Sequence, residues 1–100
     1  MTAKEKLGLV VLLLGLSGCF VVGRDFPADP VKDIQANVTT KQQIFETFGQ
    51  PFEQGLETGG YETWTYYYAS YAPGGLESRK QLQLSFNKNG TVRAYSFTAK

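Results

Sequence analysis

The sequence contains no histidine and a single cysteine, Cys19. Their scarcity excludes Ser-His-Asp and Cys-His catalysis, zinc sites built from His and Cys, and any disulfide within the chain. The sequence also has no large excess of charge of either sign. Lys and Arg number 10 and Asp and Glu number 9, which gives a net charge of +1. Such a chain has no basic face with which to displace counterions. We therefore expect no metal ion, no cofactor and no nucleic-acid partner.

Residues 1–18 have the pattern of an export signal. Lys4 and Lys6 precede an apolar run from Leu7 to Leu16, which is the charged-then-hydrophobic order of a signal peptide. Extended to Val22, the run would form a helix of about 24 Å, shorter than a hydrocarbon core of ~30 Å. A signal peptide is therefore favoured over a permanent transmembrane helix.

The segment Leu16-Ser17-Gly18-Cys19 closes the apolar run and resembles the lipobox of bacterial lipoproteins. The resemblance implies that the signal peptidase recognises Leu16, Ser17 and Gly18, and that Cys19 receives diacylglyceryl and N-acyl chains. Several acyl chains anchor a protein stably, whereas a single chain holds it only reversibly. Phe20 stands where an aspartate would resemble an inner-membrane retention signal, so we expect anchoring in outer-membrane lipid. An uncleaved signal anchor and a cleaved signal with a free thiol are the alternatives.

The rest of the chain is predicted to form a tether and one domain. Residues 19–28 contain glycine and proline without a regular pattern, which favours a flexible tether. Residues 29–100 are expected to form the domain. It would start with a short helix over residues 30–36, with Asp29 as the N-cap and Pro30 as the first helical residue.

A second helix is indicated by a capping box, in which Thr40 and Gln43 can each satisfy a backbone N–H of the other. Gly49 and Pro51 are expected to end this helix. It is too short to be stable alone, so its apolar stripe must pack on another element. That stripe consists of Ile44, Phe45 and Phe48.

Three antiparallel strands are predicted, over residues 61–69, 80–86 and 91–98. In the third strand two sets fit the core equally, Val92 with Ala94 or Tyr95 with Phe97. Residues 70–79 are expected to form a long hairpin loop, of the kind that often carries function. The predicted fold class is α+β, with two short N-terminal helices packed on a three-stranded antiparallel meander. In the first two strands the inward residues are Trp64, Tyr66, Tyr68, Leu82, Leu84 and Phe86.

Two tyrosines are candidates for binding a partner. Tyr67 alternates away from the predicted core face, and Tyr71 lies in the predicted loop, which Arg79 closes. Tyrosine is enriched at interface hot spots because its ring is large, stiff and able to form a hydrogen bond. We therefore predict partner binding by Tyr67, Tyr71 and Arg79. The alternative is that the two rings pack beneath the loop or extend the core.

A hydrolase would have to use scattered carboxylates. The candidates are Glu53, Glu57 and Glu62, and their spacing predicts no paired acid and base. We predict no catalytic residues, so the protein is not expected to be an enzyme.

Three segments together resemble a known family. These are Thr40-Lys41-Gln42-Gln43-Ile44-x-x-x-Phe48-Gly49-x-Pro51, then Trp64-x-Tyr66, then Leu82-x-Leu84-x-Phe86-x-x-x-Gly90-x-Val92. They resemble the SmpA/OmlA (BamE-like) family of small outer-membrane lipoproteins. The resemblance implies a fold similar to the repeat of β-lactamase-inhibitor protein.

The same resemblance implies a function without catalysis. It points to a lipid-anchored scaffold or accessory protein at the periplasmic face of the outer membrane, which supports outer-membrane protein assembly or envelope integrity. The implied protein partner is the barrel-assembly machinery. The alternative is a regulatory or inhibitory module that recognises another envelope protein or enzyme.

Overall fold

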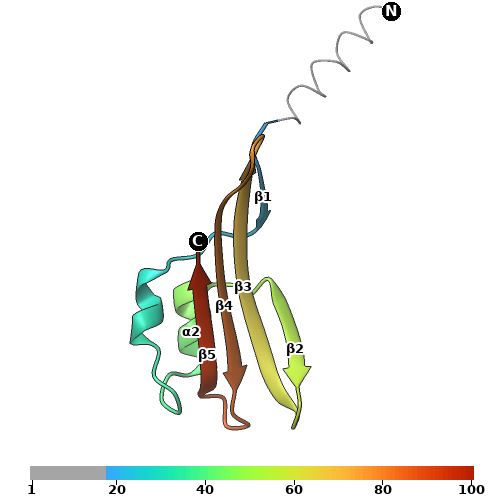
Figure 1. Ribbon diagram of the computed structural model, residues 1–100. Coiled ribbons are helices and arrows are strands. Elements are labelled where there is room, and N and C mark those ends of the chain that lie inside the picture. The colour runs from blue at the N-terminus through green and yellow to red at the C-terminus, as the bar shows by residue number, and fades with distance from the viewer. Residues whose placement is uncertain (1–17) are drawn as a thin grey trace, which may run out of the picture.

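The structure is a computed structural model that describes residues 18–100 (Figure 1). Within these residues it contains a 3-10 helix, an α-helix and five strands. The strands form one antiparallel sheet in the order β1-β3-β4-β5, and β2 also pairs with β3. The elements in chain order are β1 (Phe20–Gly23), the 3-10 helix (Asp29–Asp33), α2 (Lys41–Phe48), β2 (Glu53–Glu57), β3 (Tyr61–Ala72), β4 (Gly75–Phe86) and β5 (Val92–Ala99).

The predicted fold class is correct, but the number of elements is not. The predicted α-helix over residues 30–36 is instead a five-residue 3-10 helix. Its N-cap is Ala28, not Asp29, and no side chain caps it. Two apolar residues of this segment, Val31 and Ile34, are buried. They lie three positions apart, and a 3-10 helix places residues at that spacing on the same side.

The helix α2 begins where the capping box predicts. The hydroxyl oxygen of Thr40 accepts a hydrogen bond of 3.1 Å from the backbone N–H of Gln43. The side-chain oxygen of Gln43 accepts one of 2.9 Å from the backbone N–H of Thr40. The helix ends at Gly49, whose φ of 83° is a conformation that glycine adopts without strain.

The apolar stripe of α2 is narrower than predicted. Ile44 and Phe48 are buried, whereas Phe45 is 47% exposed. Neighbouring residues of an α-helix point about 100° apart. Because the side of α2 that carries Ile44 and Phe48 packs on the sheet, Phe45 lies outside the contact.

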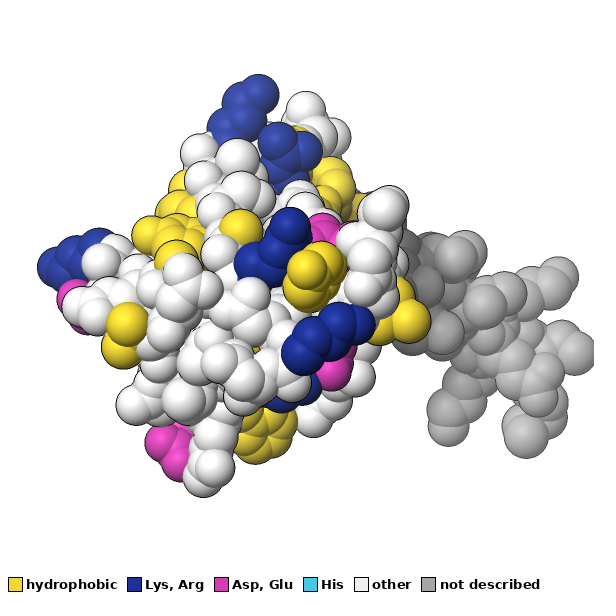
Figure 2. All heavy atoms as spheres, turned by 90° about the horizontal axis from the view of Figure 1, so that it is seen from below, with side chains coloured by type: hydrophobic (Ala, Val, Ile, Leu, Met, Phe, Trp, Pro, Cys, Tyr) yellow, Lys and Arg dark blue, Asp and Glu magenta, His cyan; other side chains and the backbone are white. Residues whose placement is uncertain are grey.

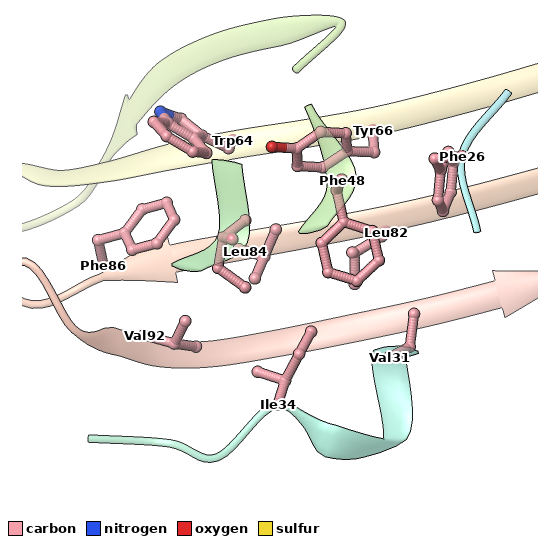
Figure 3. Packing of buried hydrophobic residues seen from close by; sticks show 11 residues of the cluster. Phe26, Val31, Ile34, Phe48, Trp64, Tyr66, Leu82, Leu84, Phe86 and Val92 are labelled. Atoms are coloured by element: carbon pink, nitrogen blue, oxygen red, sulfur yellow. The ribbon is translucent and has the colours of Figure 1, made fainter. Parts of the chain in front are cut away.

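The hydrophobic core lies between α2, the 3-10 helix and one face of the sheet (Figure 3). Trp64 and Tyr66 are 7% and 2% exposed, as their alternation predicts. The ring of Trp64 meets that of Phe86 edge-on, with 4.9 Å between the ring centroids, an arrangement that aromatic pairs favour. The buried cluster comprises Phe26, Val31, Ile34, Ile44, Phe48, Trp64, Tyr66, Leu82, Leu84, Phe86 and Val92.

An irregularity in β5 resolves which of its residues face the core. Phe86 pairs with Val92, but Ser85 pairs with Ala94, so Arg93 is an extra residue in β5. A bulge of this kind shifts the side-chain alternation by one position. Val92 therefore faces the core before the bulge, and Tyr95 and Phe97 share the core face after it. The set of Val92 and Ala94 is therefore half right, because Ala94 pairs with Ser85 on the opposite face, whereas Tyr95 and Phe97 both lie on the core face.

Residues 19–28 do not form the free tether that the sequence predicted. Phe20 pairs with Tyr71 and Gly23 with Tyr68, so β1 is a strand of the sheet. Phe26 is 4% exposed and lies in the core. Hydrogen bonds to β3 and burial of Phe26 outweigh the entropic cost of ordering a segment that contains glycine.

The predicted long loop over residues 70–79 is also absent. β3 continues to Ala72 and β4 starts at Gly75, and these two residues pair, which leaves a two-residue turn at the tip of the hairpin. A register shift beyond Ser70 makes Glu77 the extra residue of β4. Since β5 ends opposite Lys80, the hairpin projects beyond it, and within residues 18–100 β1 is the one strand that lies alongside (Figure 1).

Candidate interaction surface

The two faces of the sheet differ in their surroundings. One face packs on the helices, and we call the opposite one the outer face. Along β3, β4 and β5 the outer face carries uncharged polar side chains, and in residues 18–100 no helix covers it (Figure 1). An uncovered face rich in hydroxyl and amide groups can form many hydrogen bonds with a partner. Its central residues are Thr63, Thr65, Gln81, Gln83, Ser96 and Thr98.

The structure brings the three predicted partner-binding residues together on the outer face. Tyr67, Ala69 and Tyr71 alternate along β3, and Ala69 pairs with Arg79 on β4. Hydrogen bonding with Tyr67 raises the pKa of the Tyr71 phenol above its ordinary value, while the positive charge of Arg79 acts in the opposite direction. Ala69 is fully buried although it lies outside the core cluster, so the larger side chains around it form a continuous layer.

Two phenylalanines that the sequence analysis did not select complete this layer. The ring of Phe20 stacks on Tyr71, with 4.9 Å between centroids and 14° between planes. The ring of Phe52 lies 5.9 Å from that of Tyr67. Both phenylalanines are exposed, by 57% and 47%. Their roles depend on β1 and on the segment before β2, neither of which the sequence predicted to join the sheet.

A groove of about 350 Å³ lies beside Tyr67. It runs between the segment that leads into β2 and the outer face of β3 and β4. The groove combines an aromatic wall with amide and hydroxyl groups, which suits a peptide or a protein loop better than a charged ligand. Its lining residues are Phe52, Glu53, Thr65, Tyr67, Gln81 and Gln83.

A larger groove, of about 430 Å³, lies between the 3-10 helix and α2. Its rim includes the acidic residues Asp33 and Glu46 and the exposed Val38. None of the predicted partner-binding residues, Tyr67, Tyr71 and Arg79, lines it. The predicted surface and this larger groove are therefore different places on the domain.

Charges are dispersed at the end of the molecule that carries the β4–β5 turn. In Figure 2, which views this end, Lys and Arg side chains lie at several places among uncharged atoms, and Asp or Glu side chains lie beside some of them. Several of these charges are paired, as in the contact of 2.8 Å between Arg93 and Glu57. This end thus offers no patch of one sign for electrostatic steering.

The carboxylates considered for hydrolysis do not form an acid and base pair. Glu57 contacts Arg93 and Ser85, whereas Glu62 contacts Lys41. Glu57 pairs with Tyr61 in the sheet register, and Glu62 is the next residue, so the two carboxylates leave opposite faces of the sheet. Within residues 18–100, no group of His, Cys, Asp and Glu side chains is arranged to hold a metal ion.

Part of the predicted lipobox lies outside the described residues. Leu16 and Ser17 are not among them, whereas Gly18 and Cys19 are exposed. The thiol of Cys19 is free and lies one residue before β1. Between residues 18 and 100, the structure contains no helix with the length and hydrophobicity needed to cross a membrane.

Comparison with known families supports the predicted resemblance. A family model described as the outer membrane protein assembly factor BamE domain matches residues 26–96. The chain belongs to the BamE domain family. No curated protein matches the chain significantly. The BamE domain starts at the buried Phe26 and extends into β5, so Cys19 and β1 precede the matched region.

Proposed function

We propose that this protein is an outer-membrane lipoprotein whose BamE domain acts at the periplasmic face as a non-catalytic assembly factor for outer-membrane proteins. The observation that carries the proposal is the family match over residues 26–96, since the matching family is described as an outer membrane protein assembly factor. The proposed partner is a protein of the barrel-assembly machinery. The open outer face of the sheet gives the domain a surface for such a partner.

The proposed anchor is Cys19 of the segment Leu16-Ser17-Gly18-Cys19, which is acylated and becomes the first residue of the mature chain on cleavage. Two features support it: the cysteine is the only one in the sequence, and its side chain is exposed at the start of the described chain. Acyl chains at this position would hold the domain at the membrane and raise its effective concentration near membrane-bound partners. A scaffold needs that proximity rather than a catalytic group.

The proposed partner-binding surface is the outer face around Tyr67, Tyr71 and Arg79. Tyr67 lines the groove of about 350 Å³ together with Phe52. An aromatic residue beside a groove, surrounded by polar groups, matches the usual anatomy of an interface hot spot. Apart from Arg79 and Glu53, the groups on this surface are uncharged, which favours contact by shape and hydrogen bonding over attraction between charges.

Site-specific crosslinking tests the partner and the surface together. A photoreactive phenylalanine analogue would replace Tyr67 in the lipidated protein, and the crosslinked products would be identified by mass spectrometry of outer membranes. The matched control is the same replacement at Tyr95, which is 40% exposed on the core side of β5. We expect adducts with barrel-assembly subunits from position 67 and not from position 95.

Two other outcomes would contradict the proposal. Adducts from position 67 with an envelope enzyme alone would indicate the regulatory alternative and overturn the assembly role. Adducts with assembly subunits from position 95 alone would place the interface on the opposite face. The anchor is tested separately with Cys19→Ser, which should leave an unprocessed chain without lipid; an unchanged mass of the mature protein would overturn the assignment of Cys19.

A further inference from the structure

The end of the β3–β4 hairpin forms an apolar tip together with the start of β1. We define the apolar tip as Phe20, Val21, Leu76 and the residues 72–75 that make the turn. Phe20 and Val21 are each 57% exposed, and Leu76 is 44% exposed. The chain carries no charged residue between Glu62 and Glu77. Exposed apolar residues gathered in one place on a small domain usually mark a contact surface.

The sheet register fixes the apolar tip beside Cys19. Phe20 pairs with Tyr71, which is one residue before the paired end of β3 at Ala72. One residue of extended chain spans about 3.4 Å. Cys19 therefore lies level with the turn of the hairpin, and an acyl chain on its sulfur cannot enter a bilayer without bringing the tip to the surface while β1 stays paired.

The tip is also separated from the rest of the domain. β5 ends opposite Lys80, and the hairpin projects past it, away from the helices (Figure 1). From Tyr71 to Trp64 the strand spans seven residues, or about 23 Å at the usual rise. The tip can thus meet a flat surface while the core and α2 stand clear of it.

We propose that the apolar tip contacts the lipid bilayer, with Phe20, Val21 and Leu76 in the interfacial region. The proposal rests on the acylation of Cys19 proposed above. Stable membrane attachment often combines a lipid chain with a second contact. Transfer of exposed apolar side chains from water into the membrane interface lowers the free energy. Tyr71 is the positioning residue, since its ring stacks on that of Phe20 and holds it at the tip.

This contact would orient the domain as well as attach it. The acyl chains and the neighbouring hairpin together attach the domain over a wider area than the acyl chains alone, and they resist rotation about the anchor in a way that a single point cannot. The long axis of β3 then stands away from the membrane, and Tyr67 is held about 13 Å beyond Tyr71 along the strand. The outer face is presented to partners at a fixed height.

Quenching of a protein-bound fluorescent dye by spin-labelled lipid in vesicles tests the contact between the apolar tip and the bilayer. The lipidated protein would be placed in vesicles of phosphatidylethanolamine and phosphatidylglycerol, where Cys19 is blocked by its lipid. Leu76→Cys then offers one thiol for an environment-sensitive dye. The matched control is Leu56→Cys, because Leu56 is also an exposed strand leucine, at 75%, and lies about 30 Å from the tip along the sheet. We expect quenching by a spin-labelled lipid to be several-fold stronger at position 76.

The outcomes separate this inference from the proposed function. If the mass of the protein shows acyl chains and both positions are quenched equally, the membrane contact is overturned and the anchor stands. If Cys19 carries no lipid, its thiol also takes the dye, and both the anchor and the contact are overturned. Phe20→Ser should reduce quenching at position 76 and Phe52→Ser should not; equal effects would overturn the role of Phe20.

Discussion

The hydroxyl group of Tyr66 on β3 donates a hydrogen bond of 2.7 Å to the carbonyl oxygen of Gly49, the residue that ends α2. The tyrosine ring also packs on Phe48 in the last turn of the helix, with 5.6 Å between the ring centroids. Tyr66 is 2% exposed. A single buried side chain therefore joins the central strand to the C-terminal end of the helix.

Removal of this hydroxyl group in Tyr66→Phe should destabilise the domain. The net contribution of a hydrogen bond between uncharged groups is about 0.5–1.5 kcal/mol, and the variant also leaves the carbonyl oxygen of Gly49 without this donor. Urea unfolding at neutral pH measures the change in the free energy of unfolding. Tyr95→Phe is the control, since Tyr95 is exposed, and an equal loss in both variants would contradict the role of the Tyr66 contact.

From the burial of Tyr66 we also expect the domain to lose stability in alkaline solution. Burial raises the pKa of Tyr66 from 10.0 to about 12. The unfolded chain therefore releases this proton at a lower pH than the folded chain, and the free energy of unfolding falls as the pH rises from about 10 to about 12. The test is the difference between the two proteins: the loss should be smaller in Tyr66→Phe than in the unsubstituted protein.

The contacts of Glu62 lead us to expect that the domain loses stability as the pH falls in acidic solution. Its carboxylate accepts hydrogen bonds of 2.7 Å from Lys41 and 2.8 Å from the indole N–H of Trp64. The bond from Lys41 does most to hold the pKa of Glu62 below its ordinary value, against the opposing effect of partial burial. A depressed pKa in the folded state contributes stability above the ordinary pKa, and this contribution is lost as the pH falls through the folded-state value.

The size of this effect should be small, because the side chains of Lys41 and Glu62 are 35% and 38% exposed. We expect Glu62→Gln to lower the free energy of unfolding by less than about 1 kcal/mol at neutral pH. It should also flatten the fall in stability below the ordinary glutamate pKa of 4.5. Unfolding curves across acidic pH measure both, and Glu53→Gln controls for loss of one exposed negative charge. An unchanged acid profile in Glu62→Gln would refute the assignment.

The capping box of α2 gives a prediction about local stability. Thr40→Ala removes the hydroxyl oxygen that accepts from the backbone of Gln43, and loss of such a cap costs about 1 kcal/mol. Thr47→Ala makes the same change at an exposed position inside α2, where alanine favours the helix more than threonine does. Urea unfolding should therefore show destabilisation in the first variant and none in the second. Equal stability of the two would mean that the box contributes little.

Elements defined by local signals could be predicted from the sequence. Thr40, Gln43 and Gly49 set the ends of α2 through hydrogen bonds and backbone conformation within a few residues. The alternation of apolar and polar residues around Leu84 likewise identified the core face of β4, because it too is a pattern within a few consecutive residues. These features need no knowledge of distant parts of the chain.

Elements that depend on a distant partner could not be predicted. β2 reads Glu-Gln-Gly-Leu-Glu and is exposed along its whole length, so its strand conformation comes from pairing with β3 rather than from its own preference. The bulge at Arg93 reversed the alternation of β5 in the same unforeseeable way. On the outer face, alternation identified Tyr67 and Tyr71, but their neighbours Phe20 and Phe52 come from segments whose positions only the folded chain defines.

The attachment of β1 to the sheet gives the last prediction. Gly23 has a φ of 78°, and a Cβ atom there would overlap the backbone carbonyl oxygen of Tyr67. Gly23→Ala should therefore detach the end of β1, although it removes no contact from the core. Gly74→Ala is the matched control, because a Cβ atom at that turn position would meet nothing within 4 Å. Hydrogen exchange at the amides of β1 should become faster in Gly23→Ala alone; unchanged protection would show that the strand tolerates the side chain.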